Sequence, residues 1–135
     1  MLLAPKDLDE LKCLKMALIH DLAEIYTGDF TPEDQITAEQ KYQKELFAFK
    51  QLAQDLGYPE LTDLFEELEA QQSREALFVK SLDKIDTVLT ACYYDKNHRA
   101  PQKLVPEFGA YAQNKLKNAS EEIKNMLNQI ISVEN

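Results

Sequence analysis

Apolar residues recur along most of this chain at three- and four-residue spacings, and no stretch alternates between apolar and polar positions as a strand would. The spacing therefore predicts a wholly helical protein. A first helix is expected over residues 8–25, with Asp7 as its N-cap. A loop over residues 26–36 follows it, carrying Gly28 and Pro32.

Turn and cap residues divide the rest of the chain into further helices. Thr37 followed by Gln40 resembles a capping box and opens a helix to about Leu56, where Gly57 ends it. Four later helices are predicted, over residues 61–69, 73–91, 106–117 and 120–131. The pattern thus predicts an all-α bundle of about five to six helices.

The first predicted helix carries ionisable residues in an apolar setting. At about 100° per residue its apolar side chains form one stripe, with Asp21 at the edge. His20 falls on a second apolar stripe with Cys13 and Met16. Buried carboxylates and imidazoles are normally paired, hydrogen-bonded or bound to a metal. The residues of the first stripe are Leu11, Leu14, Leu18, Leu22 and Ile25.

The sector between His20 and Asp21 could hold a metal ion. Ala17 lies one turn before it and leaves room, and Glu24 lies one turn after it. An imidazole nitrogen with a carboxylate oxygen suits Mn, Fe, Co or Zn. The alternative is an ordinary helical His-Asp pair without a metal.

A second acidic segment, EALFVKSLDKID over residues 75–86, is predicted to be helical. Its apolar stripe passes through Phe78 and Ile85, and Asp86 lies nearer the centre of that stripe than Asp83. Periodicity alone therefore favours Asp86 for a buried role. Either carboxylate could instead be solvated or salt-bridged.

The chain resembles the HD-domain metal-dependent phosphohydrolases, and within them the branch of 5′-deoxynucleotidases. The resemblance covers residues 11–95 and rests on His20-Asp21, Ala23-Glu24, Gly28-Asp29 and the stretch from Phe78 to Lys84. It implies an HD-type helical fold in which His20, Asp21 and Asp83 bind one divalent metal ion. That ion would be Mn, Co, Fe, Zn or Mg.

The same resemblance assigns the remaining roles. Glu24 would be the catalytic acid or base, and Asp29 a catalytic group near the substrate. Asp83 is preferred to Asp86 as the later metal ligand on this ground alone, and Asp86 remains the second choice. The expected reaction is release of phosphate from a deoxynucleoside 5′-monophosphate, with the metal polarising the phosphoryl group.

One feature departs from the family pattern. The family's metal site begins with another histidine on an earlier helix, whereas none of the nineteen residues before His20 is a histidine. His98 lies in a polar segment and reads as a surface loop residue. Either the chain is an N-terminally shortened member, or it has lost its metal site. We expect exposed apolar surface on residues 8–25, covered in a homodimer.

The length and charge narrow the possible partners. A chain of 135 residues suits one domain over residues 1–135, and its apolar runs are too short to span a membrane. With 24 acidic and 15 basic residues the net charge is −9, which argues against long nucleic acids but permits a mononucleotide. Cys13 and Cys92 form no metal motif and read as reduced thiols of a cytoplasmic protein.

Two classes of function therefore remain. The first is the metal-dependent phosphomonoesterase that the resemblance implies. The second is a catalytically impaired helical domain that acts through self-association or through binding another protein. The absence of the first histidine ligand favours the second class.

Overall fold

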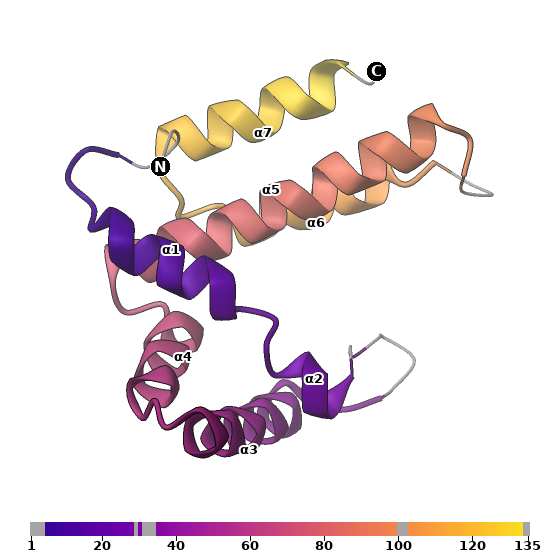
Figure 1. The fold of residues 1–135 in the computed structure, drawn as a ribbon. Coiled ribbons are helices and arrows are strands. Elements are labelled where there is room, and N and C mark those ends of the chain that lie inside the picture. Colours follow the sequence, from indigo (N-terminus) through magenta and orange to yellow (C-terminus); the bar gives the residue numbers. More distant parts are fainter. Residues whose placement is uncertain (1–4, 29, 31–34, 100–102, 134–135) are drawn as a thin grey trace. The chain divides into compact units, whose positions relative to one another are not determined.

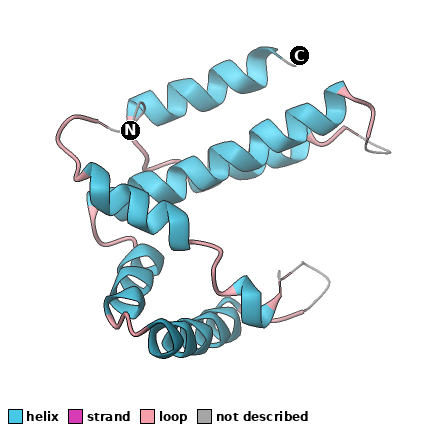
Figure 2. Cartoon of the chain, viewed as in Figure 1, coloured by secondary structure: helices cyan, strands magenta, loops and turns pink. Residues whose placement is uncertain are grey.

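The computed structural model describes residues 5–28, 30, 35–99 and 103–133. These residues form seven helices and no strand, as Figure 2 shows, so the all-α prediction is confirmed. The chain divides into two compact units, residues 1–79 and residues 80–135. The prediction of a single domain stays a prediction. The helices are α1 (Glu10–Ile19), α2 (Glu24–Thr27), α3 (Ala38–Leu56), α4 (Glu60–Ala70), α5 (Arg74–Lys96), α6 (Val105–Lys115) and α7 (Glu121–Val133).

The cap of the first helix differs from the prediction. Asp9, not Asp7, is the N-cap of α1, and its Oδ1 accepts the Lys12 backbone N–H at 3.0 Å. Asp7 instead pairs with Arg74, with 2.6 Å between its Oδ2 and the guanidinium Nη2. Both aspartates precede the apolar run, and a sequence pattern does not separate an N-cap from a nearby ion-pair partner.

The boundaries of α3 follow the predicted signals. The Thr37 backbone N–H donates to the Gln40 side-chain oxygen at 2.9 Å, and the Gln40 N–H donates to the Thr37 hydroxyl at 3.1 Å. This reciprocal pair is the predicted capping box. Gly57 ends the helix with φ of 63°, a left-handed conformation that glycine adopts without steric cost.

The predicted single helix over residues 8–25 is wrong, because the chain leaves the α-helical path after Ile19. The following turn is held by i→i+3 hydrogen bonds, in which Leu22 N–H donates to Ile19 and Glu24 N–H donates to Asp21, at 2.9 and 3.0 Å. Such bonds wind the chain more tightly than an α-helix. A short helix, α2, then begins at Glu24.

The core of the first unit is built around stacked aromatic rings. The Phe49 and Phe65 rings lie 4.2 Å apart between centroids and are inclined by 18°, and both residues are fully buried. Within this unit α3 packs on α4, α1 on α4 and α2 on α3, as can be followed in Figure 1. The buried members of this core are Ile19, Ala23, Leu46, Ala48, Phe49, Leu52, Ala53, Leu61 and Phe65.

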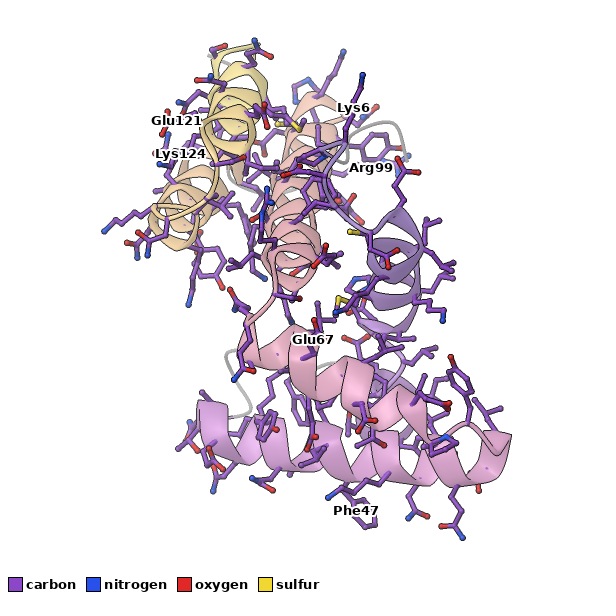
Figure 3. All side chains as sticks on the ribbon, turned by 90° about the vertical axis from the view of Figure 1, so that its left-hand side faces the viewer. Lys6, Phe47, Glu67, Arg99, Glu121 and Lys124 are labelled. Atoms are coloured by element: carbon purple, nitrogen blue, oxygen red, sulfur yellow. The ribbon has the colours of Figure 1, made fainter. Side chains whose placement is uncertain are left out.

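Helix α1 buries the second of its two predicted apolar stripes. Cys13, Met16 and Ile19 are buried, whereas Leu14 and Leu18 are 45% and 76% exposed. Leu11 and Ile25 are also exposed. The expected exposed apolar surface on residues 8–25 is thus present. Phe47 of α3 is a separate case of an exposed ring, and Figure 3 shows it pointing away from α4.

In the second unit a buried carboxylate holds the start of α6. Both oxygens of Asp95 accept the Leu104 backbone N–H, at 2.8 and 2.9 Å, and Oδ2 also accepts the Val105 N–H at 3.0 Å. These donors belong to the first residues of the helix, which lack partners within it. Helices α6 and α7 pack together, and Gly109 lies directly against the Ile131 side chain.

Within the described residues, each helix is either too short or too polar to cross a bilayer.

Candidate metal site

His20 is the C-cap of α1, and its ring is fixed by the helix that it ends. Its Nδ1 lies 2.7 Å from the carbonyl oxygen of Ala17. Because a carbonyl oxygen only accepts hydrogen bonds, Nδ1 must carry the proton. The last carbonyls of a helix have no partner within it, and the imidazole satisfies one of them.

The other ring nitrogen faces a carboxylate. His20 Nε2 lies 2.9 Å from Asp21 Oδ2. In a neutral ring whose proton is on Nδ1, both of these atoms are acceptors, and two acceptors at this distance repel each other. Either a second proton or a metal cation must therefore stand between them. A histidine that donates through one nitrogen and offers the other is the usual arrangement in a metal site.

The residues on either side of the pair are anchored in one core. Ile19 and Ala23 are 6% and 2% exposed and belong to the cluster that contains Phe49 and Phe65. The His20 and Asp21 side chains between them remain 33% and 62% exposed. The turn therefore presents two accessible donor atoms from a backbone that is held at both ends.

The C-terminal end of α1 favours the binding of a cation at this site. The C-terminal end of a helix carries roughly half a negative charge, and cations are favoured there. His20 and Asp21 follow this end directly. The site therefore suits a positive ion, as its donor set of imidazole nitrogen and carboxylate oxygen also indicates.

Glu24 lies within the same turn region. It is the first residue of α2, it is exposed, and its backbone N–H donates to the carbonyl of Asp21. It is thus close to the pair along the chain and reachable from solvent. Asp29, the other predicted catalytic residue, lies outside the described residues.

Asp83 and Asp86 differ in their surroundings on α5. The Asp83 side chain is 29% exposed and accepts a hydrogen bond from the Lys84 ammonium at 2.8 Å, whereas Asp86 is exposed. Phe78 and Ile85 are buried as predicted. Leu89, which continues the same stripe at helical spacing, is exposed, so the buried face is rotated away from Asp86. Asp83 belongs to the second unit, and its convergence on the His20-Asp21 pair stays a prediction.

No group of three or more His, Cys, Asp and Glu side chains forms a metal-holding cluster among the described residues. The pair of His20 and Asp21 is therefore the part of the predicted site that the first unit assembles by itself. Cys13 and Cys92 are both buried and form no disulfide, and burial raises the pKa of the Cys13 thiol. Cys13 thus reads as a structural thiol rather than a metal-binding thiolate. His98 is exposed in the turn after α5, as predicted.

A separate open hollow of about 530 Å³ lies along α3 and α4. It is lined mainly by acidic and polar side chains and contains none of the predicted site residues. One of its carboxylates, Glu67, is paired with Lys12, which holds the pKa of that carboxyl below its usual range. The lining residues are Tyr42, Asp63, Glu66, Glu67, Ala70, Gln72 and Ser73.

The Ala17 carbonyl was not identified by sequence reasoning. The only available signal was the position of His20 three residues later, near a helix end that the pattern did not reveal. Ala17 was noted for its small side chain. In the structure its backbone oxygen orients the imidazole.

Comparisons with known proteins agree with the family resemblance found in the sequence. The family model described as HD domain matches residues 1–126. The chain is 43% identical over 103 residues to 5′-deoxynucleotidase HDDC2 of Dictyostelium discoideum, an alignment that covers 73% of this chain and 54% of the relative. It is 39% identical over 107 residues to the human protein of the same name, covering 77% and 52%.

A yeast relative is more distant but aligns over more of the chain. The 5′-deoxynucleotidase YGK1 of Saccharomyces cerevisiae is 32% identical over 117 residues, covering 82% of this chain and 54% of the relative. The chain thus spans about half the length of the curated relatives it matches.

Proposed function

The chain belongs to the HD domain family, and from this premise we propose that it is a metal-dependent phosphohydrolase. Its reaction is the release of phosphate from deoxynucleoside 5′-monophosphates. The names of the relatives, all 5′-deoxynucleotidases, support this substrate class. The net charge of −9 is compatible with it, because one metal ion and a few donors can offset the charge of one phosphate.

The observation that carries the proposal is the geometry of His20. Its Nδ1 is committed to the Ala17 carbonyl, and its Nε2 faces Asp21 Oδ2 at 2.9 Å. When the imidazole is neutral, two electron-pair donors thus face one another in the turn that follows the C-terminal end of α1. A divalent cation relieves their repulsion and uses both as ligands.

The proposed roles are those that the family resemblance implies. His20, Asp21 and Asp83 hold the ion, which is Mn, Co, Fe, Zn or Mg, and the bound ion supplies Lewis-acid polarisation of the phosphoryl group. Glu24 is exposed one turn beyond the pair and transfers the proton in the hydrolytic step. Asp29 would be the group near the substrate, as the family resemblance implies.

A phosphate-release assay tests this function. The chain is incubated with deoxynucleoside and ribonucleoside 5′-monophosphates, with Mn²⁺, Co²⁺ or Mg²⁺ and with a chelator. We expect metal-dependent release that is faster for the deoxynucleotide. His20→Ala should abolish it, whereas His98→Ala, which removes the chain's other histidine from an exposed turn, should not. Equal losses in both variants would contradict the role of His20.

The exposed stripe of α1 favours a second function, self-association as a homodimer. Leu11, Leu14 and Leu18 occupy one face of α1 and are 63%, 45% and 76% exposed. A contiguous apolar surface of this kind is rarely left in water. Such a dimer is compatible with a catalytically active chain. In a chain without phosphatase turnover, self-association would be the main function.

Light scattering at low micromolar concentration tests the dimer. Leu18→Glu places a charge in the centre of the stripe and should yield a monomer. Leu56→Glu is the matched control, because Leu56 is 64% exposed at the end of α3, outside the stripe. A dimer that survives Leu18→Glu would contradict this interface.

The cellular location is proposed to be the cytoplasm. The two cysteines are buried and form no disulfide, as is usual where thiols are kept reduced.

A further inference from the structure

Lys84 lies beside the carboxylate that the proposed function assigns to the metal. Its Nζ is 2.8 Å from Asp83 Oδ2, and the two side chains are 28% and 29% exposed. Adjacent residues of a helix project about 100° apart, so the lysine side chain must curl back along α5 to make this contact. The pair is partly shielded from water and is therefore less screened than a fully exposed one.

The same ammonium has a second partner within the second unit. Lys84 Nζ lies 6.0 Å from the centre of the Tyr111 ring of α6, within the range of a cation–π contact. Lys115 approaches the same ring at 5.7 Å. The Lys84 ammonium thus contacts the Asp83 carboxylate and the Tyr111 ring at the same time.

From these contacts we infer that Lys84 is a positioning residue that occupies and orients the Asp83 carboxylate and competes with the metal ion for it. This inference rests on the proposed function, in which Asp83 is a ligand. An ammonium and a divalent cation at one carboxylate repel each other. Metal binding therefore requires Lys84 to withdraw from Asp83. The lysine thus lowers the affinity of the site for the metal ion, and it keeps the Asp83 carboxylate paired when no metal is bound.

Mn²⁺ is the probe, because the electron paramagnetic resonance signal of the free ion reports binding without any reaction. Lys84→Met removes the charge and keeps the straight apolar stem. It should bind Mn²⁺ about two- to fivefold more tightly than the natural chain, the range expected for one partly exposed ion pair. Lys84→Arg retains the cation and should restore the natural affinity.

Lys115→Met is the matched control. It removes the same charge from the same Tyr111 ring without touching Asp83, so it should leave Mn²⁺ affinity unchanged. The advantage of Lys84→Met should shrink as KCl is raised, because salt screens the repulsion. A purely structural lysine would not give this dependence. Circular dichroism melts confirm that each variant is folded before titration.

The possible outcomes separate this inference from the proposed function. If Asp83→Asn weakens Mn²⁺ binding but Lys84→Met matches the natural chain, competition by Lys84 is overturned and the metal site stands. If Lys84→Met and Lys115→Met tighten binding equally, the effect is one of net charge and the inference is again overturned. If no variant shows Mn²⁺ binding that depends on Asp83, the metal assignment itself fails.

Discussion

Replacing Phe65 by alanine should destabilise the first unit strongly. Phe65 is 1% exposed and stacks on Phe49, which is fully buried, with 4.2 Å between the ring centres. Truncating a buried phenylalanine to alanine costs about 3–5 kcal/mol of unfolding free energy. Tyr42, whose ring centre lies 6.0 Å away, is partly exposed and is therefore free to move toward the space, whereas Phe49 is fully buried. We therefore expect about 4 kcal/mol, within which the ring pair accounts for about 0.5–1.5 kcal/mol.

Phe47→Ala provides the matched control on the neighbouring helix. Phe47 is 66% exposed on α3, so removing the same ring should change the unfolding free energy by less than about 0.5 kcal/mol. Urea unfolding followed by circular dichroism at 222 nm measures both values. Calorimetry on the same samples tests whether each transition is two-state.

The same substitution should affect the metal site indirectly. Ile19 and Ala23, which flank the His20-Asp21 pair, belong to the core that Phe65 fills. Domains are stable by about 5–15 kcal/mol, so the variant would be marginal and its apparent metal affinity would fall with the folded fraction. Losses below about 1 kcal/mol for Phe65→Ala, or equal losses for the two variants, would refute this account of the core.

Three further outcomes are expected. The Val105 and Leu104 backbone N–H groups hold the pKa of Asp95 below its usual value of 3.8, so the stability it contributes is present above that pH and is lost as pH falls through the lowered pKa. Melting temperatures from pH 6 to pH 2 should therefore fall less in Asp95→Asn than in the natural chain, with the difference arising below pH 3.8, and parallel curves would contradict this. Glu24→Gln should lower phosphatase turnover by roughly 10²–10⁴ while Mn²⁺ binding persists, and unchanged turnover would remove Glu24 from the mechanism. Gly57→Ala should cost about 1 kcal/mol in urea unfolding, because φ is 63° and space around a new Cβ is open; no loss would mean that the backbone relaxes there.

Local signals in the sequence were sufficient to predict a helix boundary wherever that boundary is formed by residues close together in the chain. The capping box of Thr37 and Gln40 and the left-handed Gly57 are both made within one turn of the chain, and both predictions are confirmed. The end of α1 was missed because neither glycine nor proline marks it. It depends instead on a side chain, since His20 bonds a carbonyl that a continuing helix would use.

Burial was harder to predict than helix position. Both faces of α1 are apolar, and the more regular leucine stripe is the exposed one. Periodicity shows that a stripe exists but not which partner covers it. On α5 periodicity favoured Asp86, whereas Asp83 is the more buried carboxylate. The choice of Asp83 came from family resemblance, and the position of Asp83 relative to His20 stays a prediction.

The Ala17 contact has a consequence for how this site can be dissected. The group that orients the His20 ring is a main-chain oxygen, and every amino acid at position 17 supplies the same atom. A side-chain scan of α1 therefore cannot measure the contribution of this oxygen to the His20 tautomer, because no substitution at position 17 removes it. Only a change in the backbone itself, such as replacing the peptide unit by an ester that accepts hydrogen bonds more weakly, would reveal the contribution. By the same reasoning, sequence divergence at position 17 leaves the orienting oxygen in place.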